Sequence, residues 1–516
     1  MATSYTSKKL AFNNAEQFKE SFYEPEPATL GYIFIGNHVA WPNEDAPPSS
    51  LDSVANEKSI WDNMYAGKRI TGNDVELVIP RINWTTGTVY QQYDDITELS
   101  QQLTSNTAQN LGPIYVMNSE RNVYICLSNN ISANSTTEPT GKNISANGII
   151  QTADGYLWKY LYNIRPTNKF YTNNWIPAPV STGKLDYDTS PAISVDGELA
   201  SIVVTNGGSG YIHSNITVSN FSTGCTVLSL SNTNNLAANM SISGTGIATG
   251  THITNVDVVN TTITLSTSTT TSGGGSGAYE VRTRIYIQGD GTGAIAMDGL
   301  SNGQIQKITV TSYGKNYTSA NVLIYGTGTG ATARAILSPK FGHGFNAAKE
   351  LGASNVMIAM RIGEVDSTEG GIISANTTFR QYGFLRDPYK YGTTSPAVAS
   401  LANNVFSQTT NITVVSGSSY NLNEFVYQGP SVENSTFSGY VHNYSSNLIK
   451  LTKVKGTISV GSPLKGTETN PSGRTIVTYT NPEYQPYTGD ILYEENFVRI
   501  ERTDGQAENL KFVIQF

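Results

Sequence analysis

Residues Asp154–Ile164 have the sequence DGYLWKYLYNI, and this stretch indicates the fold class of the chain. Every second side chain is aromatic, and on a β-strand alternate side chains share one face. The four rings are those of Tyr156, Trp158, Tyr160 and Tyr162. Leu157 and Leu161 would lie on the opposite face, with Lys159 between them. Such a strand would be buried on both faces, in the central sheet of a layered β structure.

The period of this stretch also fits a helix, in which Tyr156 would neighbour Tyr160 one turn later. Aromatic residues are enriched in strands, and an Asp-Gly pair is typical of the turn before one. We therefore expect a strand here, with the rest of the chain packed around it.

The composition favours β structure throughout. The chain has 516 residues, too many for one ordinary core, so about two to four domains are expected. Only 14% of the residues are charged, against about 25% in an average protein. The chain is instead rich in Ser, Thr and Asn, with 48 Gly and 30 Tyr, a mixture typical of strands and turns. The expected fold class is mainly β: a layered β-sandwich core with short helices and two inserted small β modules.

Net charge and targeting signals narrow the classes of function. A formal net charge of −8 argues against a nucleic-acid partner, because such binding relies on Lys and Arg neutralising phosphates. Residues 1–9 lack the apolar stretch of a signal peptide, and no apolar run approaches the ~18 residues of a membrane span. Cys126 and Cys225 are too few and too far apart in the sequence to indicate a disulfide framework. We expect synthesis in a reducing cytoplasm, no nucleic-acid partner and no membrane insertion.

Short helices and apolar strands are expected to build the core. The helices are Asn13–Tyr23, capped by Asn13 or Asn14, and Ser53–Tyr65, capped by Ser53. The strands include Gly31–Gly36, Val75–Pro80, Asn355–Ile362, Thr377–Asp387 and Phe425–Gln428, with paired strands in Ile114–Leu127. A final hairpin is predicted from Gly489–Glu501 and Leu510–Phe516, joined by Thr503-Asp504-Gly505. The residues expected to pack in the core are Trp41, Trp61, Pro80, Trp84, Tyr156, Trp158, Tyr160, Phe379 and Phe512.

Two segments differ from the core in composition and are predicted to be inserted β modules. In the first, Ile202–Tyr211 parallels Ile308–Tyr317, and Ile285–Ala294 parallels Leu323–Ala331. Each repeat is a strand, a glycine turn and a strand, with a further unit between the repeats and a linker at Ser268–Gly277. The predicted domains are a discontinuous core (1–195, 341–400 and 481–516), a glycine-turn repeat module (196–340) and a small barrel-like module (401–480).

The sequence contains no recognisable catalytic or metal-binding pattern. The five histidines stand singly, and Gly342-His343-Gly344, the most site-like of them, is interpreted as a turn histidine. Gly207–Gly210 lacks the spacing of a hydrolase nucleophile turn. Gly326–Gly330 leads into a predicted strand, where a phosphate-binding loop needs a helix. Acidic pairs such as Asp94-Asp95 are interpreted as solvated turns. We expect no enzyme activity, no cofactor and no metal site.

Several motifs outside the modules occur in the order found in a known family. The early motifs are Thr6-Ser7-Lys8, Phe34-Ile35-Gly36, Trp41 before Pro47-Pro48, and Val78-Ile79-Pro80-Arg81 with Trp84. The later motifs are Gly155–Leu161, Phe379-Arg380-Gln381, Gly489–Glu494 and Phe512–Phe516. Together they resemble the baseplate wedge proteins of T-even-like contractile-tailed phages, the gene-eight product family. The resemblance covers roughly residues 6–190, 341–390 and 486–516.

The resemblance implies a β-sandwich that homodimerises in the virion, in the wedge of a tail baseplate. There it would bridge neighbouring wedge proteins and relay the trigger for contraction, after synthesis and assembly in the bacterial host cytoplasm. The inserted modules depart from the family. They leave open an alternative function, a tail adhesin that recognises host-surface glycans, and a third, a polysaccharide depolymerase.

Overall fold

The computed structural model describes residues 7–23, 29–105, 111–180, 187–188, 194–363, 373, 375–398, 404–503 and 505–516. Thr6 and Asp504, which belong to two of the predicted motifs, lie outside these ranges. The fold is mainly β, as expected, with several sheets and one closed barrel. It divides into two compact units: Met1–Lys9 with Val78–Ala353, and Leu10–Leu77 with Ser354–Phe516. The three-part domain assignment made from the sequence stays a prediction.

The first unit is built around β9 (Leu157–Ile164), the strand predicted from the aromatic stretch. Its sheet has the order β11 (Tyr187–Asp188), β9, β7 (Asn122–Ser128) and β6 (Tyr115–Met117), and β8 (Ile149–Gln151) also pairs with β9. The rings on one face and Leu157, Lys159 and Leu161 on the other are all buried. The prediction of a strand covered on both faces is therefore confirmed.

Short elements complete this part of the first unit. Val78–Pro80, the end of β3 (Val75–Pro80), pairs with β10 (Trp175–Pro177), and β4 (Val89–Tyr90) pairs in parallel with β5 (Leu111–Gly112). The helical turns are α3 (Leu99–Gln102), η2 (Ile144–Ala146) and α4 (Ala347–Glu350).

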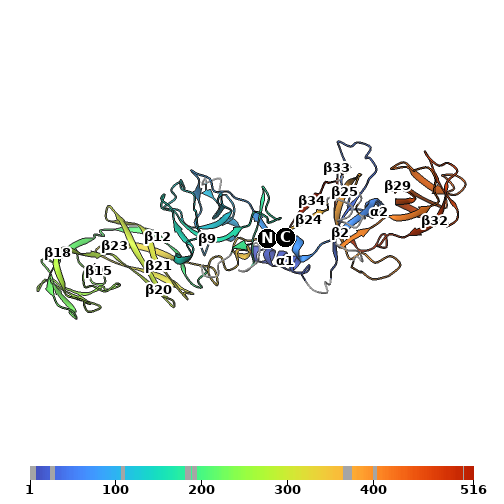
Figure 1. Cartoon of the computed structure of the whole chain (residues 1–516). Helices are drawn as coiled ribbons and strands as arrows, with labels where there is room; N and C mark the ends of the chain where they lie inside the picture. Colours follow the sequence, from blue (N-terminus) through green and yellow to red (C-terminus); the bar gives the residue numbers. More distant parts are fainter. Residues whose placement is uncertain are drawn as a thin grey trace, which may run out of the picture. The chain divides into compact units, whose positions relative to one another are not determined.

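The two predicted repeats of the first inserted segment fold into one six-stranded sheet (Figure 1). Its order is β12 (Leu199–Ser209), β23 (Thr329–Leu337), β22 (Ala320–Tyr325), β19 (Arg284–Gly289), β20 (Thr292–Ser301) and β21 (Gln304–Lys315). Strands β12, β19 and β20 of the first repeat pair with β23, β22 and β21 of the second. Gly208 and Gly314 hold equivalent left-handed positions, with φ of +61° and +64°, beside the rings of Tyr211 and Tyr317. The sequence repeat is thus a structural duplication with pseudo-two-fold symmetry.

A nested submodule interrupts the duplication between β12 and β19. Its two sheets are β13 (Ser214–Phe221), β18 (Gly273–Arg282) and β15 (Ser241–Gly244), and β14 (Val227–Ser229), β17 (Thr262–Leu265) and β16 (Ile253–Asp257). The predicted linker at Ser268–Gly277 is wrong in its second half, because Gly273 pairs with Phe221 of β13. A side chain at Gly273 would collide with the Phe221 ring and the Tyr279 hydroxyl, so this glycine allows close strand packing.

The second unit contains a β-sandwich. One sheet has the order β26 (Val405–Ser407), β2 (Met64–Arg69), β1 (Gly31–Gly36), β25 (Thr377–Arg386) and β33 (Asp490–Arg502), and β24 (Asn355–Ile362) pairs with β34 (Glu508–Gln515) in the other. Rings join the layers: the centroids of Tyr382 on β25 and Tyr493 on β33 lie 5.5 and 5.7 Å from that of Phe512 on β34. The expected sandwich layers are present in this unit.

Helices of the second unit flank the sandwich. They are α1 (Lys8–Glu20), which belongs to this unit from Leu10 onward, α2 (Val54–Asn63) and the turn η1 (Gly72–Asp74). The predicted Ser53 cap is confirmed, because its hydroxyl accepts the Asn56 N–H at 3.2 Å. The predicted start of the first helix is wrong: α1 begins at Lys8, so Asn13 and Asn14 lie inside it.

The predicted final hairpin is also wrong. β33 pairs with β25, whereas β34 pairs with β24 in the opposite layer. The chain crosses between the layers of the sandwich after Arg502, because each terminal strand finds its partner in a distant, earlier strand.

Residues 410–480 form a closed barrel in the second unit. Its strand order is β27 (Thr410–Val414), β30 (Leu448–Gly456), β29 (Phe437–Ser445), β28 (Phe425–Gln428), β31 (Pro463–Gly466) and β32 (Arg474–Thr480). Its interior is filled by apolar side chains, among them Ile412, Val426 and Leu451, each fully buried. Closure of the barrel leaves no free strand edge. The buried apolar side chains inside it form a core of its own.

Candidate functional site

The residues predicted to pack in the core occupy different environments. Trp61, Tyr156, Trp158, Tyr160 and Phe379 are at most 3% exposed. Trp41, Trp84 and Phe512 are half-buried, and Pro80 is exposed. Pro80 is therefore not a core residue; its carbonyl accepts a hydrogen bond from the Tyr115 hydroxyl at 2.7 Å, at the end of a strand. Proline is tolerated there because it has no N–H to donate to a sheet.

Lys159, the single charged residue of the aromatic strand, forms a buried ion pair with Glu198. Its Nζ lies 2.5 Å from Glu198 Oε1, and neither side chain is more than 1% exposed. Burial lowers the pKa of Lys159, and the Glu198 carboxylate opposes this shift. Because Glu198 directly precedes β12, the pair fixes the first strand of the inserted module against β9. Loss of either partner would leave an uncompensated buried charge, which costs about 3–5 kcal/mol.

Arg334 of β23 adds a second contact between the module and the rest of the unit. Its guanidinium lies 2.6 Å from Asp94 Oδ1 and 2.5 Å from Asp95 Oδ1. The interpretation of this acidic pair as a merely solvated turn is therefore wrong. His343 lies in a turn, as predicted, but it is buried, with Nδ1 2.6 Å from Glu350 Oε1.

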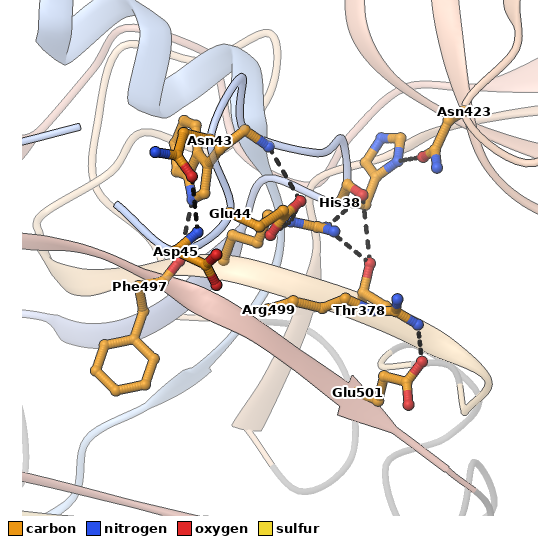
Figure 2. Close-up of polar contacts among 11 residues, drawn as sticks. His38, Asn43, Glu44, Asp45, Thr378, Asn423, Phe497, Arg499 and Glu501 are labelled. Atoms are coloured by element: carbon orange, nitrogen blue, oxygen red, sulfur yellow. Dashed lines mark hydrogen bonds and ion pairs between the residues drawn. The ribbon is translucent and has the colours of Figure 1, made fainter. Parts of the chain in front are cut away.

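In the second unit, Arg380 of β25 holds the loop that follows β1. Figure 2 labels His38 and Glu44 of this loop. Its Nε donates to both carboxylate oxygens of Glu44, at 2.8 and 3.0 Å, and its Nη1 donates to the His38 carbonyl at 2.8 Å. The hydrogen bond from Arg380 lowers the pKa of Glu44. Trp41, on the same loop, donates its indole N–H to the Phe497 carbonyl of β33 at 3.0 Å. The loop thus covers part of an edge strand that would otherwise be open to pairing.

Two buried histidines lie where this loop meets the barrel. The His38 ring nitrogens lie 2.5 Å from Asn423 Oδ1 and 2.5 Å from Thr452 Oγ1. Burial lowers the pKa of His38 to about 4, although its hydrogen bond with Asn423 opposes the shift. His442 of β29 stacks on Tyr65 at 4.0 Å, and neither of its ring nitrogens has a hydrogen-bond partner among the described residues. Burial also lowers the pKa of His442, so both rings are uncharged at neutral pH.

An apolar cleft of about 460 Å³ opens between β33 and β34, the last strands of their sheets. We call it the sandwich mouth. Its lining includes Phe18, Tyr382, Phe384, Leu492, Phe512 and Phe516. Leu492 is 46% exposed and Phe516 37%. An exposed apolar concavity of this kind is typical of a protein-binding surface.

Neither a metal cluster nor a membrane-spanning helix is found among the residues that the structure describes. Within those ranges, no three His, Cys, Asp or Glu side chains gather as metal ligands. The helices found there are all too short or too polar to cross a membrane.

The sequence does not predict the contacts of Glu198, Arg334, Arg380 and His442, because their partners are distant in the chain. One local signal was present: Lys159 is a charge in the middle of an apolar strand, and such a charge needs a buried partner.

The structure defines a mainly β protein with a duplicated six-stranded sheet, a closed barrel, buried polar contacts and an apolar sandwich mouth. No protein-family model matches the chain. Over 182 residues it is 25% identical to the baseplate wedge protein gp8 of Enterobacteria phage T4. The match covers 30% of this chain and 54% of that protein, so the chain spans about half the length of this relative.

Proposed function

We propose that the chain is a structural subunit of a phage tail baseplate wedge and acts through protein contacts, not catalysis. The observation that carries this proposal is the partial similarity to a baseplate wedge protein. The buried ion pair between Lys159 and Glu198 supports it, because a module fixed in this way can transmit force. In the virion, the subunit bridges neighbouring wedge proteins and relays the contraction trigger to them.

The subunit forms a homodimer through the sandwich mouth. This surface combines exposed apolar side chains, such as Leu492 and Phe516, with two terminal strands. A second copy that covered both mouths in a two-fold arrangement would bury these side chains on both chains at once.

Light scattering coupled to size-exclusion chromatography tests the dimer. The wild-type chain should elute with twice its mass of 55.6 kDa, and Leu492→Glu should be monomeric, because it places a charge in the apolar contact. Val259→Glu is a matched control, since Val259 is 91% exposed and lies in the other unit. A monomeric wild type, or a dimeric Leu492→Glu variant, would contradict the dimer.

Wedge assembly needs a separate experiment. The tagged chain should co-purify with the other wedge proteins of its virion when they are expressed together. Recovery of the chain alone would argue strongly against the baseplate role, whatever its oligomeric state.

A further inference from the structure

Three exposed tyrosines surround a second cleft in the second unit, which we call the tyrosine cleft. Its volume is about 320 Å³, and it lies between the barrel and the segments around α2 and Tyr487. Tyr391, Tyr479 and Tyr487 are 40%, 39% and 51% exposed. Tyrosine has an apolar ring and a polar tip, so it is suited to a ligand that carries both kinds of surface.

Trp61, a residue of the cleft lining, carries an unsatisfied buried donor. Its side chain is 3% exposed, yet its indole N–H has no hydrogen-bond partner among the described residues. A buried donor without an acceptor costs about 1–3 kcal/mol, so a ligand oxygen placed there would recover this free energy.

Two lining residues have unusual backbone conformations. Lys453 and Tyr487 have φ of +51° and +63°, in the left-handed region that non-glycine side chains rarely adopt. The Tyr487 hydroxyl donates to Asp62 Oδ1 at 2.6 Å, which holds its ring at the entrance. Strain of this kind occurs at ligand-binding sites, where it positions side chains.

The charges and polar groups of the lining indicate the chemistry of the ligand. Asp62 and Lys453 are its two charged residues and balance each other, whereas Asn481 and Gln485 supply amide donors and acceptors. A sugar ring has an apolar C–H face that can cover a tyrosine ring, and its hydroxyls can bond to the amides and to the indole N–H. A charged ligand would find no unpaired residue of opposite charge in this lining.

We propose that the tyrosine cleft is a binding site for a neutral saccharide. The site is formed by the barrel together with the neighbouring core segments. It shares no lining residue with the sandwich mouth, so an experiment can reject saccharide binding without rejecting dimer formation, and the reverse.

A glycan array probed with the purified full-length chain tests the proposal. The array should carry neutral hexose and N-acetylhexosamine oligosaccharides beside sulfated and uronic acid oligosaccharides. We expect binding to at least one neutral oligosaccharide and no preference for the acidic ones. Absence of binding to every neutral probe, or binding to acidic probes alone, would overturn the proposal.

Substitutions then locate the site by titration calorimetry with the neutral oligosaccharide that the array identifies. Tyr391→Ala and Tyr479→Ala should each weaken binding roughly tenfold, and Trp61→Phe should weaken it without lowering the melting temperature. Tyr286→Ala is the matched control, because Tyr286 is 41% exposed but lies in the other unit. Wild-type affinity in both tyrosine-cleft variants would overturn the assignment, and an unchanged melting temperature shows that each variant is folded.

Discussion

At Trp158 the surrounding rings exclude water completely. The side chain is fully buried, 5.5 Å from the Tyr156 ring and 5.4 Å from the Tyr90 ring. Trp158→Ala should therefore lower the free energy of unfolding by about 3–5 kcal/mol, because it leaves a large cavity. Denaturant unfolding measures this loss. Val259→Ala, at a 91% exposed position, should stay within about 0.5 kcal/mol of wild type. A fully stable Trp158→Ala variant that failed to assemble would instead identify the strand as an interface.

The buried histidines make the second unit sensitive to acid. The pKa of His38 is lowered to about 4, so in acid the folded chain binds fewer protons than the unfolded chain. The free energy of unfolding should therefore fall as the pH drops from about 6.5 towards 4, and His38 alone contributes about 3 kcal/mol of this loss. Urea unfolding at a series of pH values measures the slope. A stability that does not change over this range would contradict the burial of a neutral His38.

His442→Phe separates the two histidines. A phenyl ring keeps the stacking on Tyr65 and removes two nitrogens that have no hydrogen-bond partner among the described residues. At pH 7 the variant should be as stable as wild type or more stable by about 1 kcal/mol. Its stability should also fall less steeply in acid, because burial lowers the pKa of His442 as well. The same unfolding series tests both effects, and a loss of stability at pH 7 would show that the imidazole has a bonding role.

At the scale of elements, the duplicated sheet depends on glycine at equivalent left-handed positions, Gly208 in β12 and Gly314 in β21. A β carbon on Gly208 would lie 2.5 Å from the Ala331 nitrogen and the Thr329 oxygen, both backbone atoms that cannot move aside. Gly208→Ala should thus cost about 3 kcal/mol or more. Gly224→Ala is the control, because Gly224 also has a left-handed φ, +85°, but open space around it, so only the strain of about 1–2 kcal/mol applies. Equal losses of stability in thermal unfolding would show that the close approach is unimportant.

The elements that the sequence predicts well are those set by local pattern. Gly31–Gly36 and Asn355–Ile362 form strands with the predicted bounds, because a compact apolar run fits a buried strand wherever it pairs. Pairing itself depends on distant residues. The predicted final hairpin is therefore wrong, although both of its strands are present.

The candidate sites could not be predicted for the same reason. The tyrosine cleft combines Trp61, Tyr391, Tyr479 and Tyr487, which are spread over more than four hundred residues of sequence. Each of them alone resembles any other aromatic residue of a β-rich chain. The position of the cleft follows from how the barrel meets the neighbouring segments, which no local pattern of the sequence shows.

At the scale of the whole molecule, the sandwich mouth predicts how association responds to salt. Its exposed side chains are mainly apolar, so charge screening should have little influence on a dimer formed there. Between about 0.05 and 1 M sodium chloride, the dimer dissociation constant should change by less than about threefold or decrease slightly. Sedimentation equilibrium measures this constant. A weakening of more than about tenfold would contradict a mainly apolar contact at the sandwich mouth, whose lining also includes Glu495 and Lys511.

The duplicated sheet also has a consequence for engineering. The nested submodule is inserted in the first repeat after Tyr211. Its first and last strands lie side by side, because Ser214 pairs with Val281, so its two ends are close together. The equivalent connection of the second repeat, after Tyr317, is a tight turn of a few residues before β22. By symmetry, this turn is a natural acceptor site for a foreign domain whose ends lie equally close together. The first repeat already carries the nested submodule at this connection. The turn after Tyr317 in the second repeat can therefore be used to insert and display a second domain.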